Sequence, residues 1–421
     1  MEQTAPGKNW AGNYSYQGRG LYLPRDVSEI QHLVMSNEKV KALGSRHCFN
    51  DIADSSGVLI STEHLDSIEI RADAMAVSIG SGVRYGQLGI ALDAAGFALP
   101  NLASLPHISV AGACATATHG SGVGNRILAA SVIGLEFVSG TGDIVRLDRG
   151  SPDLTGAVVS LGALGVVTEL ELAIEPRFEV GQTVFLGLDL SSLAENFDEI
   201  ISAAYSVSLF TYWQERQIDQ VWIKRRSDAA ASLPNEFFGA VPAVENVHPL
   251  RGSSAENCNE QLGIEGPWHE RLPHFRLGFT PSGGEELQSE YFVPRRNAIE
   301  ALLALDRIRE RIAPLLLVSE IRSIAADDLW MSPCFETDCV AFHFTWKQDV
   351  RAVTHLLPVI ENELAPFQAK PHWGKLFTTP PADLRKLFPM LADFGALARK
   401  YDPPGKFLNR FLETTVFAAQ S

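Results

Sequence analysis

The sequence predicts an α+β protein of two domains. Its 421 residues exceed the roughly 250 to 300 residues at which one hydrophobic core stops growing. Residues 1–175 are rich in Gly, Ala and Val, as in short strands and helices joined by glycine loops. From residue 176 the pattern changes to amphipathic helices and alternating strands, which is typical of an antiparallel sheet with helices on one face.

In the first domain, Pro24 ends the opening strand, and Asp26 with Glu29 forms a capping pair at the start of a helix over 27–35. A second helix is expected over 85–95. Strands are predicted over 21–23, 40–43, 58–61, 75–79, 131–138 and 144–147. Ser139-Gly-Thr-Gly-Asp joins the last two strands as a hairpin turn.

The second domain carries the longer elements. Strands are predicted over 207–212, 220–224, 287–293, 315–323 and 339–346. Helices are predicted over 194–204, 296–312 and 350–364. Residues 228–283 are rich in Pro, Gly and Asn, and we interpret them as a long insertion around a substrate entrance. We therefore expect domains of 1–175 and 176–370, with residues 371–421 returning to the first domain.

Composition and charge exclude several classes of protein. Hydrophobic residues make up 46% of the chain and charged residues 20%, and no apolar run approaches the roughly 20 residues of a membrane helix. The formal net charge of −15, without a long basic stripe, argues against nucleic acid and anionic membranes as partners. A small neutral or cationic substrate is the expectation that remains.

The first residues and the cysteines indicate a cytoplasmic protein. The N-terminal residues lack the basic start and apolar stretch of a secretory signal. The five cysteines are odd in number and scattered, which fits reduced thiols better than disulfides, and they show no zinc-site spacing, so we expect no metal. They are Cys48, Cys114, Cys258, Cys334 and Cys339.

Several familiar motifs are absent or incomplete. Gly80-Ser-Gly82 precedes a helix, but Tyr85 stands where a dinucleotide fingerprint needs its third glycine. There is no P-loop, and Val158 replaces the first glycine of a nucleophile elbow around Ser160. The stretch from His269 to His274 has the wrong spacing for a zinc-binding helix and contains a proline.

Two glycine-rich loops remain, over 43–50 and 102–124. The second consists of small and hydroxyl residues with almost no charge. Such a stretch lets backbone amides approach a pyrophosphate closely. Composition alone leaves a packing seam of small residues equally open.

These loops carry a resemblance to a known family. Gly44-Ser-Arg-His47 after a buried strand, with Ser109-Val-Ala-Gly112 and Ala117-Thr-His119-Gly further on, resembles the vanillyl-alcohol-oxidase type of FAD enzyme. His372-Trp-Gly-Lys375 is shared with the sugar and aldonolactone oxidases of that superfamily. Over essentially the whole chain the sequence is similar to the alditol (xylitol) oxidases, including residues 205–210, 267–275 and 287–291. The resemblance implies an FAD-binding domain followed by an antiparallel-sheet cap domain.

The resemblance also implies where FAD lies. His47 would hold it covalently, which raises the flavin's reduction potential and prevents its loss. Arg46 and Cys48 stand where relatives often have Gly and Ser. The other implied contacts are Ala42, Leu43, Gly44, Ser45, Arg46, Cys48, Ser104, Ser109, Gly112, Thr116, Ala117, Thr118, His119, Val167 and His372.

Two predicted strands present polar side chains in pairs. The two-residue period places Leu316, Val318, Glu320 and Arg322 on one face of strand 315–323. On strand 339–346 the same period places His343 and Thr345 together, with Phe342, Phe344 and Trp346 on the opposite face. Spacing alone leaves open a salt bridge within the sheet and a hydrogen-bonded histidine.

By the resemblance, the polyol-binding and active-site residues are Ser104, Glu320, Arg322, Thr345 and Lys375. A neutral chain of hydroxyls needs acceptors and donors such as these. The implied reaction moves a hydride from the terminal C1 hydroxymethyl of an alditol (xylitol, sorbitol, mannitol or glycerol) to flavin N5, giving the aldose. Lys375, whose neutral form the like charge of Arg322 would favour, is the first candidate for taking the hydroxyl proton, with Glu320 and His343 as alternatives.

The electron acceptor and the alternatives follow from the same resemblance. In this family a small residue beside the flavin decides whether O2 enters, and Ala103 occupies that place, so we expect an oxidase that produces hydrogen peroxide. A monomer is the usual state in this group. Two other functions stay open: an aldonolactone oxidoreductase of the gulonolactone or galactonolactone type, and a flavin- or sugar-binding protein without turnover.

Overall fold

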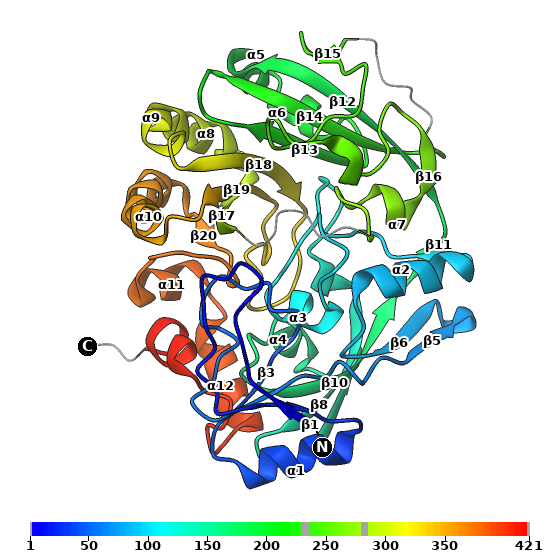
Figure 1. Cartoon of the computed structure of the whole chain (residues 1–421), viewed down its shortest axis with the longest axis vertical. Helices are drawn as coiled ribbons and strands as arrows, with labels where there is room; N and C mark the ends of the chain where they lie inside the picture. The colour runs from blue at the N-terminus through cyan, green and yellow to red at the C-terminus, as the bar shows by residue number, and fades with distance from the viewer. Residues whose placement is uncertain (1, 230–235, 279–284, 419–421) are drawn as a thin grey trace.

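The structure, a computed structural model, describes residues 2–229, 236–278 and 285–418. Helices and mainly antiparallel sheets are both present, and one large sheet fills the upper part of the molecule while smaller sheets fill the lower part (Figure 1). The predicted α+β class is confirmed. Within the described ranges, no helix has the length and apolar character needed to cross a membrane.

The first small sheet lies near the N-terminus. Its strands follow the order β1 (Glu2–Thr4), β2 (Leu21–Leu23), β4 (Val58–Ile60) and β3 (Val40–Ala42). Helix α1 (Val27–Ser36) begins where Asp26 accepts a hydrogen bond from the Glu29 amide, as its sequence predicts. Ile30 and Val34 of α1 pack against Val40, which buries this face of the sheet.

The second small sheet is antiparallel throughout. Its order is β5 (Ile68–Arg71), β6 (Ala76–Gly80), β10 (Gly165–Ala173), β8 (Val132–Ser139) and β9 (Ile144–Asp148). The hairpin predicted between β8 and β9 is confirmed, whereas β5 and β10 were not predicted. The short elements around this sheet are α2 (Tyr85–Ala94), β7 (Phe97–Ala98), α3 (Val110–Ala115), α4 (Leu154–Ala157) and β11 (Glu175–Pro176).

Within the described residues the large sheet has nine strands, and all neighbouring strands pair antiparallel. Its order is β15 (Val241–Pro242), β12 (Glu179–Asp189), β14 (Gln217–Arg226), β13 (Ser206–Thr211), β18 (Leu316–Ile324), β19 (Cys339–Lys347), β17 (Glu286–Pro294) and β20 (Lys370–Pro371), with β16 (Glu265–Pro267) also on β12. All five strands predicted for this part of the chain are present, and the long strand β12 was missed.

Helices cover one face of this sheet, so the other face is free to line a cavity (Figure 1). The covering helices are α5 (Leu190–Glu195), α6 (Phe197–Ile201), α8 (Ala298–Arg307), α9 (Arg309–Ile312) and α10 (Val350–Leu364). Two predicted helices are broken. Asn196 leaves helical geometry (φ −123°, ψ 25°), and both its backbone amide and its side-chain amide donate to the Ser192 carbonyl, so α5 ends there. The backbone of Ile308 (φ −106°, ψ 12°) likewise separates α8 from α9.

A β-bulge in β18 places Leu316 on the opposite face of the strand from the one predicted. The register between β18 and β19 shifts between Leu316 and Val318, so one residue of β18 has no counterpart on β19. Leu316 therefore packs into the core beneath the helices, whereas Val318 points to the opposite side. The prediction that both share a face was wrong, because a strict two-residue period does not hold across a bulge.

The end of the chain lies against its beginning, with the red helices beside the blue region in Figure 1. This segment contains α11 (Pro381–Leu387) and α12 (Leu391–Tyr401). The Val40 amide donates to the Lys406 carbonyl, and Phe407 packs in the core of the first small sheet. Lys41 reaches across and donates to the carbonyls of Leu161, Gly162 and Phe407.

Candidate active site

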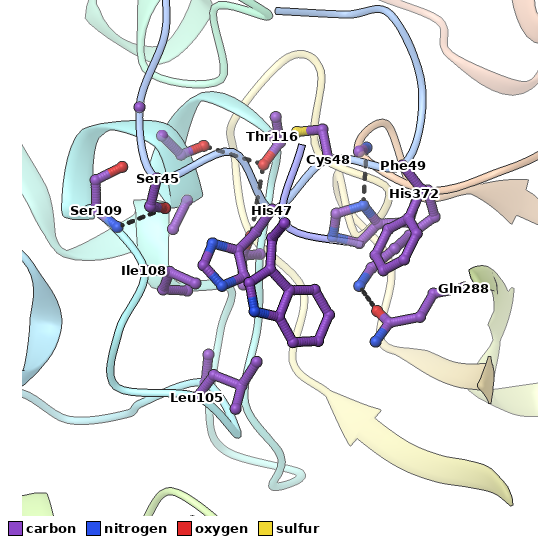
Figure 2. Close-up of a pocket in the computed structure, with 18 of the residues that line it drawn as sticks. Ser45, His47, Cys48, Phe49, Leu105, Ile108, Ser109, Thr116, Gln288 and His372 are labelled. Atoms are coloured by element: carbon purple, nitrogen blue, oxygen red, sulfur yellow. Dashed lines mark hydrogen bonds between the residues drawn. The ribbon is translucent and has the colours of Figure 1, made fainter. Parts of the chain in front are cut away.

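A cavity of about 310 Å³ lies where both glycine-rich loops meet the free face of the large sheet. Figure 2 shows its centre, with Ser45, His47 and Cys48 on one loop, Ser109 and Thr116 on another, and Gln288 and His372 opposite. All predicted site residues line this cavity except Ala117. Ala117 adopts a left-handed backbone (φ 59°) that turns the chain between Thr116 and Thr118, both of which line it.

His47 combines three features of a nucleophile: ring nitrogens with no partner in the described part of the chain, a fixed ring and a neutral charge state. Both ring nitrogens are buried, and neither has a hydrogen-bond partner among the described residues. Trp10 stacks on it with ring centroids 5.3 Å apart and an interplanar angle of 19°. Burial lowers the pKa of His47 to about 4, so the imidazole is neutral with a free lone pair at physiological pH.

The N-terminal segment holds the His47 loop. The Trp10 amide donates to the Arg46 carbonyl at 2.9 Å, and the Arg46 guanidinium returns a bond to the Pro6 carbonyl at 2.7 Å. The Asn9 side chain donates to the Cys48 carbonyl at 2.9 Å. Three bonds on either side of His47 therefore fix the backbone that carries it.

The two glycine-rich loops touch each other closely. The Ser109 amide donates to the Ser45 hydroxyl at 3.0 Å. A Cβ added at Gly44 or at Gly112 would lie 2.7 Å from the Ser109 hydroxyl, which itself has no partner among the described residues. A larger residue at either position would require the Ser109 hydroxyl to move, and this hydroxyl lines the cavity.

The polar side chains on the free face of the sheet form one connected set. Arg322 donates to Glu290 at 3.0 Å and to the Ser104 hydroxyl at 3.3 Å, and its Nε lies 3.5 Å from Glu320. His343 Nε2 lies 3.2 Å from the Thr345 hydroxyl. Four of the five residues expected to bind substrate, namely Ser104, Glu320, Arg322 and Thr345, thus lie together with His343.

Glu290 on β17 is the centre of this set and was missed. Its Oε1 lies 3.0 Å from His119 Nε2, and its Oε2 lies 3.4 Å from His343 Nδ1. Burial alone would raise the pKa of Glu290, but His119 and His343 outweigh it, so the net pKa lies well below the usual range. The signal was available: Gln288 and Glu290 follow the same two-residue period as Glu320 and Arg322.

Lys375 lines the cavity, as does His372. Its Nζ donates to the Gln288 side-chain carbonyl and lies 5.0 Å from the centroid of the Phe49 ring. Burial lowers the pKa of Lys375 against the opposing charges of Glu290 and Glu286, and Arg322 adds a smaller lowering effect. The sequence predicted the direction correctly but named Arg322 as the cause, whereas removal from water is the larger effect.

Two residues close to Glu320 were also not predicted from the sequence, namely His274 and Lys224. His274 Nε2 is 2.8 Å from Glu320 Oε1, and His274 Nδ1 is 3.1 Å from Lys224 Nζ. His274 belongs to the stretch 228–283, of which 230–235 and 279–283 lie outside the described residues. Nearby residues of that stretch also line the cavity, namely His248, Pro249, Leu250 and Phe275.

Buried polar atoms without partners among the described residues, glycines at close approach and the cavity between the two loops together fit a dinucleotide-type cofactor. Residues 19–148 match the family described as FAD binding domain, and residues 285–415 match the family described as D-arabinono-1,4-lactone oxidase. Two cholesterol oxidase structures, one titled solvent-stable and one from B. sterolicum, superpose with TM-scores of 0.77 and 0.79. They share 14% and 13% identity and cover 98% and 99% of this chain and 97% of each of theirs. Fold and site define an FAD-dependent oxidoreductase.

Closer sequence relatives define the family. The alditol oxidase of a Streptomyces species is 50% identical over 96% of this chain and 97% of its own. The L-gulonolactone oxidase of Mus musculus is 24% identical over 97% of this chain and 98% of its own. The chain belongs to the alditol oxidase family.

Proposed function

We propose that the protein oxidises the terminal hydroxymethyl group of a small polyol, with FAD as its cofactor and O2 as the electron acceptor. The observation that carries this proposal is the connected polar set on the large sheet, which lies in the same cavity as His47. The similarity to an alditol oxidase along nearly the whole chain supports it.

FAD would be held by the two glycine-rich loops and by Val167 and His372, and covalently by His47. The neutral, unpartnered imidazole of His47 and the rigid backbone around it support the covalent bond. Bound there, FAD would supply a hydride acceptor for the substrate and a donor of two electrons to O2.

The polyol would be held by groups that match its hydroxyls. Glu320 accepts, Arg322 donates, and Ser104 and Thr345 do both. Each of these side chains is anchored by a neighbour, so their orientation does not depend on the substrate. A carbon chain laid along β18 and β19 would present its first two hydroxyls to Glu320, Arg322 and Lys375.

Lys375 would take the hydroxyl proton. Burial favours its neutral amine, which can donate to Gln288 and still offer a lone pair. Glu320 is a weaker base, because Arg322 and His274 outweigh the effect of burial and hold its pKa well below the usual range. We therefore assign acceptance of the proton to Lys375 and orientation to Glu320 and Arg322.

Ala103 would leave the path of O2 open, since it lines the cavity next to Ser104 with only a methyl group. The test is aerobic and anaerobic mixing of the yellow protein with xylitol. We expect bleaching without air, and one hydrogen peroxide per xylitol consumed in air. A protein that needs a dye or cytochrome as acceptor would contradict the oxidase, and one that no polyol bleaches would contradict the whole proposal.

A sugar lactone is the second candidate substrate, because residues 285–415 match the D-arabinono-1,4-lactone oxidase family. The two substrates differ at the reacting end, where the lactone has a ring carbonyl. Reduction rates measured with xylitol, sorbitol, mannitol, glycerol and two aldonolactones decide between them. A lactone that reduces the flavin faster than every polyol would favour the second candidate.

We propose further that residues 1–175 with 371–421 form the FAD-binding domain and that 176–370 form the cap. We also propose a cytoplasmic location and a monomer. All five cysteines of the chain are free thiols, which supports a reducing compartment. Sedimentation of the purified protein tests the monomer.

A further inference from the structure

The side chain of Lys224 is buried, and each of the three protons of its ammonium form has an acceptor. Its Nζ donates to the carbonyls of Leu272 and Pro273, the latter at 2.9 Å, and lies 3.1 Å from His274 Nδ1. An ammonium group has three protons and no acceptor site. Three acceptors therefore match three donors, and the third acceptor is an imidazole nitrogen.

This arrangement fixes the tautomer of His274. Because the ammonium of Lys224 donates to Nδ1, that nitrogen carries the lone pair and Nε2 carries the hydrogen. Nε2–H then points at Glu320 Oε1, 2.8 Å away, and donates to it. Oε1 of Glu320 is thereby engaged, which leaves Oε2 to accept from a substrate hydroxyl in the cavity that Glu320 lines.

The ring has no freedom to turn away. Phe210 and Trp222 pack edge-on against His274 at centroid distances of 5.6 and 5.1 Å. The His274 amide donates to the Ser104 carbonyl at 3.0 Å, which ties this turn to the second glycine-rich loop. The ring can therefore respond to Lys224 only by moving its proton between the two nitrogens.

We propose that Lys224 and His274 are positioning residues that hold Glu320 ready for the polyol, so that the protonation state of Lys224 sets the affinity for the substrate. The proposal rests on the proposed function of the same cavity. When Lys224 is a neutral amine, it can accept from His274 Nδ1–H. His274 Nε2 then turns a lone pair toward Glu320, and the carboxylate loses its donor.

The charges around Lys224 place this change near neutral pH. Burial lowers the pKa of Lys224 to about 7, although Glu320 opposes the shift; Arg322 adds to it. Cys258 also faces the group, but burial raises the pKa of this thiol to about 12, so it stays neutral. Glu320 itself faces Arg322, His274 and His343 and remains ionised across this range. The ammonium form exists below about pH 7, so affinity should fall as pH rises through 7.

The test separates affinity from rate. Anaerobic stopped-flow reduction of the holoenzyme at increasing xylitol concentrations gives an apparent Kd and a limiting rate at each pH. As Lys224 loses its proton, the Glu320 carboxylate loses its hydrogen bond from His274 Nε2–H and is no longer held for the substrate. We therefore expect the wild-type Kd to rise about tenfold between pH 6 and 8.5. The limiting rate should not follow this change, because it reports Lys375.

Two substitutions of Lys224 should have opposite effects on the Kd. Lys224→Met should raise the Kd about tenfold at pH 6 and remove its pH dependence. Lys224→Arg keeps a permanent cation and should hold the Kd low at every pH. Lys370→Met is the matched control: Lys370 is a partly buried lysine that donates to the Pro333 carbonyl and does not line the cavity, so this variant should keep the wild-type profile.

A second measurement does not need turnover. Nitrogen-15 NMR of the histidine-labelled holoenzyme, with the His274 signal assigned from its loss in His274→Gln, reports the tautomer directly. We expect Nε2–H below pH 7 and a shift above it that is absent in Lys224→Arg. A Nδ1–H tautomer at pH 6, or a Lys224→Met enzyme with wild-type Kd and profile, would overturn the proposal. If no polyol reduces the wild type while the tautomer is as stated, only the proposed function fails.

Discussion

Replacing Glu290 by Gln removes the charge at the centre of the polar set while keeping its shape. Arg322, His119 and His343 would lose their shared carboxylate, of which two oxygen contacts are 3.0 Å long. Breaking a buried ion pair from one side costs about 3 to 5 kcal/mol. At an unfolding entropy of about 2.1 cal/mol/K per residue, a chain of this length should lose about 3 to 6 °C in Tm.

The pH dependence follows from the lowered pKa of Glu290. A carboxyl group whose folded pKa is depressed stabilises the protein above its unfolded pKa of about 4.3, and this stabilisation is lost as pH falls. The difference in Tm between wild type and Glu290→Gln should therefore be full at pH 7 and smaller at pH 4. Differential scanning calorimetry of both proteins at several pH values measures it.

Glu361 provides the matched control. It accepts bonds from the Tyr291 hydroxyl at 2.9 Å and from the amide and hydroxyl of Thr378, and these donors are neutral. Glu361→Gln should change Tm by less than half as much, because no cation loses its partner. A Glu290→Gln protein that melts within 1 °C of wild type at pH 7 would refute the reasoning.

Three further outcomes are expected. His47→Ala should release all of its flavin when the protein is acid-precipitated, so that the precipitate is colourless. Trp10→Leu should lower the fraction of flavin that stays with the precipitate, because it removes the stacking partner of His47. If His47→Ala keeps all of its flavin, His47 is not the attachment site. Lys375→Met should slow anaerobic flavin reduction at least a hundredfold by removing the base, and a rate within threefold of wild type would assign the proton elsewhere. Gly44→Ala should lower the FAD content of purified protein, since its Cβ would lie 2.7 Å from the Ser109 hydroxyl; unchanged content would show that Ser109 can rotate aside.

The sequence predicted the parts of the fold that depend on local pattern. Alternation identified β17, β18 and β19 within one or two residues of their ends. Strand β12 was missed because Gly181 and Gly187 interrupt its apolar run and are typical of turns.

The site was only partly predictable, for a related reason. Residues on short motifs, such as His47 and Lys375, could be named from the motif. Glu290 and His274 acquire their roles from partners far along the chain, 171 residues away for His119 and 46 for Glu320. Spacing within a strand carries no information about which distant side chain will lie opposite.

The bond from Val40 to Lys406 has a consequence for biosynthesis. Residues 1–175 leave the ribosome first, yet β3 lacks its last hydrogen-bond partner, and the core around it lacks Phe407, until almost the entire chain has been made. At about 5 to 20 residues per second, this interval lasts roughly 12 to 50 s. Cofactor loading should therefore follow translation rather than accompany it, and a nascent chain stalled before residue 400 should emerge colourless.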